Sequence, residues 1–105
     1  MVKKIKSECG WIVFHLNNNE LDKLMDKDYF DNICDSCNRY LSNVYYIPVL
    51  NHGMCEHCFN EWNRSSKYYP EDADFENQAV QWIEGIFSKI MIEVIDPAEQ
   101  EGKGE

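Results

Sequence analysis

Residues 34–58 contain two pairs of cysteines in the form C-x₂-C, CDSC at positions 34–37 and CEHC at positions 55–58. Seventeen residues separate the pairs, a spacing that is typical of a site with four thiolate ligands. Two thiolates with two residues between them can turn toward one ion, and two such turns complete the tetrahedron that Zn²⁺ accepts. The pattern predicts one structural zinc ion per chain, bound by Cys34, Cys37, Cys55 and Cys58.

Closely spaced cysteines also occur in disulfides, redox pairs and iron sites. No βαβ pattern surrounds either pair, which disfavours thioredoxin-like chemistry, and the five cysteines are an odd number. The basic start MVKKIK precedes an apolar stretch at residues 11–16 that is shorter than the roughly 7–15 residues of a signal peptide. We therefore expect reduced thiols and a cytoplasmic location.

The residues that follow each pair predict different backbone shapes. Asn38 follows the first pair, and asparagine tolerates the left-handed conformation with which a metal-binding knuckle closes. The second pair continues into FNEW at residues 59–62, the start of an amphipathic helix that we expect to run from Glu56 to about Lys67. The second pair would then lie at a helix N-terminus, where free N–H groups stabilise thiolates.

The segment between the pairs predicts a hairpin. Its sequence VYYIPVL at residues 44–50 is rich in strand-forming side chains. Pro48 should lie at an edge or a strand end, because it cannot donate to a ladder. Asn51 and Gly53 are the expected turn residues.

This order of knuckle, hairpin and helix resembles the GATA-type and LIM-like treble-clef zinc fingers over about residues 34–66, and the seventeen-residue separation is that of the GATA type. The resemblance implies that the same four cysteines are the ligands. GATA-type fingers bind DNA through basic residues, whereas this segment has only Arg39, Arg64 and Lys67 among several acids. The resemblance therefore implies the fold of these zinc fingers for this segment but not their DNA binding.

A strand and a helix are expected before this finger, and a long helix after it. Residues 11–16 predict a strand, and Asn19 is expected to cap a helix that ends near Asp31. Asp72 or Asp74 is expected to cap a long amphipathic helix of about five turns that stops at Asp96-Pro97. Its apolar stripe consists of Phe75, Ala79, Trp82, Ile83, Ile86, Phe87, Ile90 and Val94, widened by Val80, Met91 and Ile92.

The length and composition fit a single small α+β domain, residues 1–97, followed by a flexible acidic tail, residues 98–105. A chain of 105 residues with 44% hydrophobic residues can close one modest core. Metal binding contributes free energy comparable to the stability of such a domain. No stretch approaches the roughly 20 apolar residues needed to cross a bilayer.

The charge distribution favours a protein partner over nucleic acid. The net charge of −9 has the wrong sign for binding a phosphate backbone. Residues 71–105 hold ten acids and two lysines, a surface that is either simply solvated or steers onto a basic partner. The ten acids are Glu71, Asp72, Asp74, Glu76, Glu84, Glu93, Asp96, Glu99, Glu101 and Glu105.

These observations predict a non-enzymatic, zinc-binding protein-interaction module. It is comparable in size and charge to acidic inhibitors, encoded by phages and mobile elements, of nucleic-acid-handling enzymes. A homodimer through the long helix is a further expectation. The alternative is a nucleic-acid-binding zinc finger or transcriptional regulator, which requires one patch made of Lys3, Lys4, Lys6, Arg39, Arg64 and Lys67. With four protein ligands the zinc has no position for an activated water, and no catalytic fingerprint occurs elsewhere.

The remaining chemically active side chains are expected to have structural roles. Cys9 has no paired cysteine and is predicted to be an idle or buried thiol. His15 lies in an apolar run and is expected at the core or an edge. His52 and His57 flank the second pair and could each replace a cysteine as ligand, but four cysteines already suffice. The tyrosines of the hairpin are expected in the core rather than in a base-stacking platform.

Overall fold

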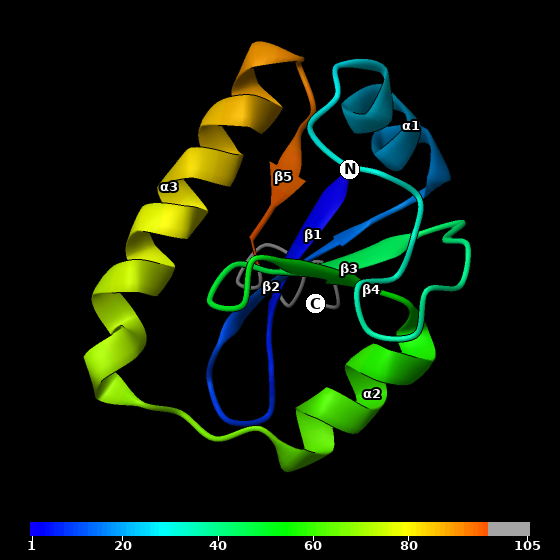
Figure 1. The fold of residues 1–105 in the computed structure, drawn as a ribbon. Helices are drawn as coiled ribbons and strands as arrows, with labels where there is room; N and C mark the ends of the chain where they lie inside the picture. Colours follow the sequence, from blue (N-terminus) through cyan, green and yellow to red (C-terminus); the bar gives the residue numbers. More distant parts are fainter. Residues whose placement is uncertain (97–105) are drawn as a thin grey trace, which may run out of the picture.

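A computed structural model describes residues 1–96 of the chain (Figure 1). Within this range the helices are α1 (Asn18–Asp26), α2 (Glu56–Ser65) and α3 (Ala73–Lys89), with a 3₁₀ turn, η1 (Pro70–Asp72), before α3. The strands are β1 (Val2–Lys6), β2 (Ile12–Leu16), β3 (Val44–Ile47), β4 (His52–Met54) and β5 (Val94–Ile95). They form one sheet in the order β4-β3-β2-β1-β5, so the predicted α+β class is confirmed.

Strand β1 has no counterpart among the sequence predictions, which considered its lysines as a basic leader and as part of a possible nucleic-acid-binding patch. It pairs antiparallel with β2 and parallel with β5, and it therefore lies inside the sheet. Val2 is completely buried, and the ammonium of Lys4 lies 3.1 Å from the carboxylate of Glu84 on α3. Three lysines interrupt the apolar pattern by which this strand could be recognised in the sequence. They are compatible with a strand in the sheet because Lys3 and Lys6 are exposed and Lys4 has an acidic partner.

The two faces of the sheet carry different helices. Phe14 and Tyr46 are register partners on β2 and β3, and the Phe14 ring packs edge-on against Phe87 of α3 at 5.5 Å. Their neighbours His15 and Tyr45 are also partners and point to the opposite face, where Tyr45 stacks on Phe59 of α2 at 4.3 Å. Helices α3 and α2 therefore cover opposite faces, as Figure 1 shows.

Helix α1 starts earlier and ends earlier than predicted. Asn17, not Asn19, is the N-cap, because its side chain accepts from the Glu20 N–H while the Glu20 carboxylate accepts from the Asn17 N–H. Asp28 takes a left-handed conformation with φ of 61°, and the Tyr29 N–H donates to the Leu24 carbonyl. This pattern is a Schellman motif, which ends the helix at Asp26 rather than near Asp31.

Helix α3 ends seven residues before the predicted stop at Asp96, at Lys89. Met91 has φ of 60° and the Ile92 N–H donates to the Phe87 carbonyl, so a second Schellman motif closes this helix. The chain then turns back, and Val94 pairs with Val2 in the sheet instead of extending the helix. The cap residue Asp72 is as predicted, although its side chain makes no capping hydrogen bond.

The predicted apolar stripe of α3 is only partly correct. Val80, Ile83, Ile86 and Phe87 are buried against the sheet. Phe75 and Trp82 are instead 52% and 49% exposed, and Met91 beyond the helix is 86% exposed. The helical spacing of the sequence predicted that these side chains share one apolar stripe. The sheet covers a narrower face of the helix than that stripe.

The predicted hairpin is present as β3 and β4, with Pro48 directly after β3. Asn51 has φ of 53° and is a turn residue, as expected. Gly53 lies within β4, so the prediction of a turn role for it is wrong. A Cβ atom at Gly53 would lie 2.9 Å from Cγ2 of Val44, so the glycine is required by close packing between the two strands.

Within residues 1–96 no helix has both the length and the apolar character to span a bilayer. The predicted acidic tail, residues 98–105, lies outside the described residues.

Candidate metal centre

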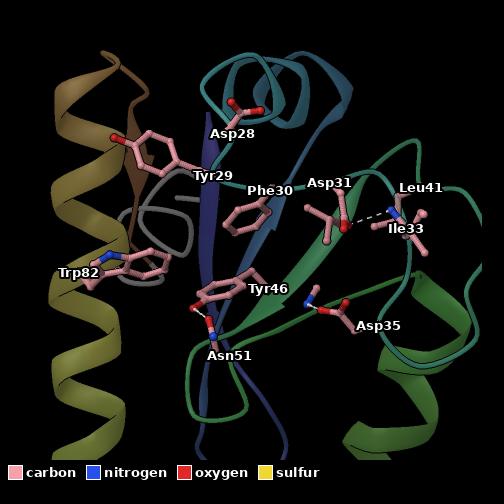
Figure 2. A pocket seen from close by; sticks show the side chains of 12 residues that line it. Asp28, Tyr29, Phe30, Asp31, Ile33, Asp35, Leu41, Tyr46, Asn51 and Trp82 are labelled. Carbon is pink, nitrogen blue, oxygen red and sulfur yellow. Dashed lines mark hydrogen bonds between the residues drawn. The ribbon is translucent and has the colours of Figure 1, made fainter.

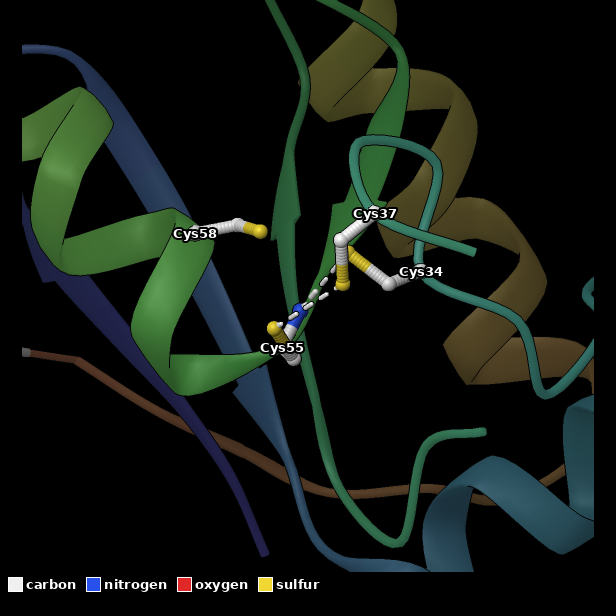
Figure 3. Close-up of side chains that lie close together, drawn as sticks. All are labelled: Cys34, Cys37, Cys55 and Cys58. Atoms are coloured by element: carbon white, nitrogen blue, oxygen red, sulfur yellow. Dashed lines mark hydrogen bonds between the residues drawn. The ribbon is translucent and has the colours of Figure 1, made fainter. Parts of the chain in front are cut away.

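The four cysteines of the two C-x₂-C pairs converge on one point (Figure 3). The sulfur atoms of Cys34, Cys37, Cys55 and Cys58 all lie within 4.8 Å of one another. A tetrahedron of sulfurs around Zn²⁺, with bonds of about 2.3 Å, has edges of about 3.8 Å. The Sγ atoms of Cys37 and Cys55 are already 3.8 Å apart. The cluster can therefore hold one tetrahedral metal ion after shifts of an ångström or less.

The first pair lies on a tight turn between α1 and β3. The Cys34 N–H donates to the Arg39 carbonyl at 2.9 Å, and the Asn38 N–H donates back to the Cys34 carbonyl at 2.9 Å. Asn38 has φ of 63°, which confirms the left-handed closure expected of it. These bonds direct both sulfurs of the turn toward the second pair.

The second pair opens helix α2, as predicted. Cys55 is the N-cap residue, with an extended backbone and no side-chain cap hydrogen bond, and Cys58 lies in the first turn. The free N–H groups and the positive end of the helix dipole are therefore close to both sulfurs. These N–H groups can donate to thiolates, which are the form of cysteine that binds metal.

A pair of hydrogen bonds attaches the first turn to strand β4. The Asp35 N–H donates to the Gly53 carbonyl at 2.9 Å, and the Gly53 N–H donates to the Asp35 carboxylate at 2.9 Å. The sequence pattern predicts no role for Asp35. Because Gly53 was predicted as a turn residue, the sequence contained no signal of this close backbone approach.

The electrostatics of the cluster differ among its sulfurs. Burial raises the pKa of the Cys34 thiol, but hydrogen bonds from the backbone N–H groups of Cys55, Cys37 and Ser36 outweigh burial and lower it to about 6. The Cys55 N–H lies 3.3 Å from this sulfur. Burial raises the pKa of the Cys58 thiol to about 12, and hydrogen bonds with the other three cysteines add to the increase. Four adjacent thiols cannot all ionise unless a cation offsets their repulsion.

Burial also differs across the cluster. Cys34 and Cys58 are buried, Cys55 is partly buried and Cys37 is exposed. One side of the cluster therefore belongs to the hydrophobic core, while the other is open to solvent, from which an ion can enter. All five cysteines of the chain, each within the described residues, are free thiols in this structure.

The other candidate side chains lie outside this cluster. His52 is exposed on β4, and His57 is exposed with its Nε2 3.3 Å from the Glu61 carboxylate. Neither joins the group of potential ligands found within residues 1–96. His15 stacks on Tyr45 at 4.1 Å and lies 3.2 Å from the Asn43 amide, so it has the structural role expected of it.

Cys9 has hydroxyl neighbours rather than a metal-binding partner. Its sulfur lies 3.2 Å from Ser66 Oγ and 3.5 Å from Ser7 Oγ. Burial raises the pKa of this thiol, but the two hydroxyls and backbone N–H groups outweigh burial and lower it. Cys9 is only partly buried, so it joins the α2 terminus to the β1–β2 turn rather than filling the core.

Comparison of the chain with protein-family models, curated proteins and solved structures finds no match in any of the three.

Proposed function

We propose that residues 34–66 form a treble-clef zinc centre whose role is structural, and that the chain is a non-enzymatic module that binds a basic protein. The observation that carries the proposal is the convergence of four sulfurs, two from a tight turn and two from a helix N-terminus. Four thiolates favour Zn²⁺ over hard cations such as Mg²⁺ and Ca²⁺, which prefer oxygen ligands.

The structural role of the metal follows from what the cluster connects. The first turn lies on an irregular segment between α1 and β3, and within the described residues few backbone bonds attach it to the sheet. One ion bound by both pairs fixes this segment to α2 and, through Asp35 and Gly53, to β4. Four protein ligands close the coordination sphere, so the ion has no position for substrate.

The proposed partner follows from charge. Of the acids in residues 71–96, five are exposed: Glu71, Asp72, Asp74, Glu93 and Asp96. Two of the predicted surface acids have other roles, since Glu76 is buried and Glu84 pairs with Lys4. The remaining surface still attracts a basic protein and repels a phosphate backbone. An inhibitor or regulator of a nucleic-acid-handling protein would use such a surface.

The metal is tested by mass spectrometry and by cobalt substitution. We expect one zinc per chain, and a Co²⁺ form whose visible spectrum shows tetrahedral thiolate coordination. A chelator should unfold the protein, as followed by circular dichroism. A folded preparation with no metal, or a cobalt spectrum typical of oxygen ligands, contradicts the zinc centre.

The partner is tested with immobilised, zinc-loaded protein in a nuclease-treated lysate. We expect a basic protein to be captured from both treated and untreated lysates. A variant with Glu71→Gln, Asp72→Asn and Asp74→Asn should no longer capture it. Retardation of DNA or RNA by the purified chain at low salt, lost as salt rises, would instead support the nucleic-acid-binding alternative. Sedimentation of the purified, zinc-loaded chain tests the predicted homodimer.

A further inference from the structure

A cavity of about 400 Å³ lies apart from the four sulfurs, on the α3 side of the sheet (Figure 2). Its walls come from the segment between α1 and the first cysteine pair, from the β3–β4 hairpin and from α3. Cavities that bind small molecules typically have volumes of about 300–1,000 Å³. The size of this cavity therefore suits a ligand group such as one long side chain.

The cavity has aromatic walls. Phe30 and Tyr46 form one wall, with ring centroids 5.1 Å apart, and the Tyr46 hydroxyl donates to the Asn51 amide at 2.7 Å. Tyr29 and Trp82 also line the cavity and remain 37% and 49% exposed. Figure 2 shows Trp82 extending from α3 toward Tyr46, with Tyr29 between α3 and Phe30. The faces of such rings carry the negative part of a quadrupole and attract cations.

The charges in the cavity have one sign. Its lining includes Asp28, Asp31 and Asp35 and no lysine, arginine or histidine. Within residues 1–96 none of these three carboxylates forms an ion pair. Asp35 is engaged by the Gly53 N–H, and one oxygen of Asp31 accepts from the Ile33 N–H at 3.3 Å. Asp28 and the second oxygens of Asp31 and Asp35 are the carboxylate atoms that a ligand can use.

We propose that this cavity binds the guanidinium group of an arginine side chain from a protein partner. A guanidinium is planar, stacks on aromatic rings and pairs with a carboxylate through two parallel hydrogen bonds. The aromatic walls and the carboxylates of Asp28 and Asp31 provide both interactions. A hydrated metal ion would not use the rings, and a nucleic-acid phosphate would be repelled by the aspartates. The assignment deepens the proposed function and rests on its basic partner.

The direct test uses the zinc-loaded chain and a capped Gly-Arg-Gly peptide. The amide and indole N–H signals are followed by NMR, and the indole signal of Trp82 is the one that the Trp82→Ala variant lacks. We expect the chemical shift of the Trp82 indole to change and to saturate as the arginine peptide is added. A capped Gly-Gln-Gly peptide, the uncharged control, should cause no change. A glutamine peptide that binds equally well, or a lysine peptide that binds more tightly than arginine, would overturn the assignment.

Two variants separate the cavity from general attraction to an acidic protein. Trp82→Ala and Asp31→Asn should each weaken peptide binding by roughly 3- to 30-fold. Phe75→Ala is the matched control, because Phe75 is equally exposed on the same helix but does not line the cavity. Equal affinities for Trp82→Ala, Asp31→Asn, Phe75→Ala and the unchanged protein would show attraction to the overall charge and refute the site.

The capture experiment distinguishes this inference from the proposed function. Loss of the captured partner by Trp82→Ala, but not by Phe75→Ala, supports the cavity as the contact site. If both variants still capture the partner and the peptide does not bind, the cavity inference fails while the proposed function stands. If the peptide binds as described and no basic protein is captured, the proposed function fails while the guanidinium site remains.

Discussion

The carboxylate of Glu76 on α3 accepts a hydrogen bond of 2.7 Å from the backbone N–H of Ile12, the first residue of β2. Glu76 is only 6% exposed, although the sequence analysis counted it among the acids of a solvated surface. A buried acid is stabilised when it accepts a hydrogen bond from a backbone donor that has no other partner. This bond therefore attaches the first turn of α3 to the beginning of a central strand.

Glu76→Ala should destabilise the protein by about 1–3 kcal/mol, because it leaves the Ile12 N–H without its acceptor. Glu76→Gln should cost less, since its amide carbonyl can accept the same bond. Urea unfolding of the zinc-loaded protein measures both values. Asp74→Ala, an exposed acid two residues earlier, is the control and should change stability little. Equal losses for Glu76→Ala and Asp74→Ala would contradict the role of this contact.

Cys34→Ser and Cys55→Ser should each lose bound zinc and lower the melting temperature far more than Cys9→Ser. A missing ligand forfeits much of the metal-binding free energy, which is comparable to the stability of a small domain. Cys9 lies outside the four-sulfur group and is replaced by a hydroxyl beside two other hydroxyls. Metal analysis and thermal melts in the presence of a reductant measure the difference. Equal zinc content and equal melting temperatures in all three variants would rule out the assigned ligands.

Gly53→Ala and Gly85→Ala should change stability in opposite directions. The new methyl group at residue 53 would lie 2.9 Å from Val44 Cγ2, so overpacking should cost about 1–3 kcal/mol. At residue 85, in the middle of α3, the methyl group meets no atom within 4 Å, and alanine should stabilise the helix by about 0.5–1 kcal/mol. Chemical denaturation measures both. A neutral Gly53→Ala would show that the hairpin can adjust at no cost.

Tyr46 should make the fold sensitive to alkaline pH. Burial raises the pKa of Tyr46 to about 12, whereas the phenol of an unfolded chain ionises near pH 10. Because the folded state holds this proton more tightly, the resulting stability is fully present below pH 10 and is lost as pH rises toward 12. Burial also raises the pKa of Tyr45, which acts in the same direction.

Tyr46→Phe removes the titrating group and should therefore flatten the loss of stability between pH 10 and pH 12. At neutral pH it should cost about 1 kcal/mol, because the hydrogen bond to Asn51 is lost. Tyr40→Phe is the control, since Tyr40 is 83% exposed and should keep the pH dependence of the unchanged protein. Urea unfolding at several pH values compares the slopes. A Tyr46→Phe slope as steep as that of the unchanged protein would contradict the assignment.

Local chemistry was predictable where few residues determine it. The convergence of the four cysteines, the left-handed Asn38 and the start of α2 at Cys55 all follow from short stretches of sequence. The first strand, the two helix ends and the role of Gly53 could not be predicted in this way. Neither helix end carries the glycine that most often marks a C-terminal cap: Asp28 takes a positive φ at the first, and Met91, whose type does not favour it, at the second.

The sequence by itself determined the kind of site, because two residues between cysteines bring their sulfurs together whatever the remainder of the chain does. Only the tertiary structure decided that Val2 and Val94 lie on paired strands and that Glu76 is buried. It also placed Trp82 and Asp31 on the walls of one cavity. These outcomes depend on contacts between residues more than fifty positions apart, and their energies arise only when the sheet has formed. The pattern of residues within a short stretch of sequence therefore does not predict such contacts.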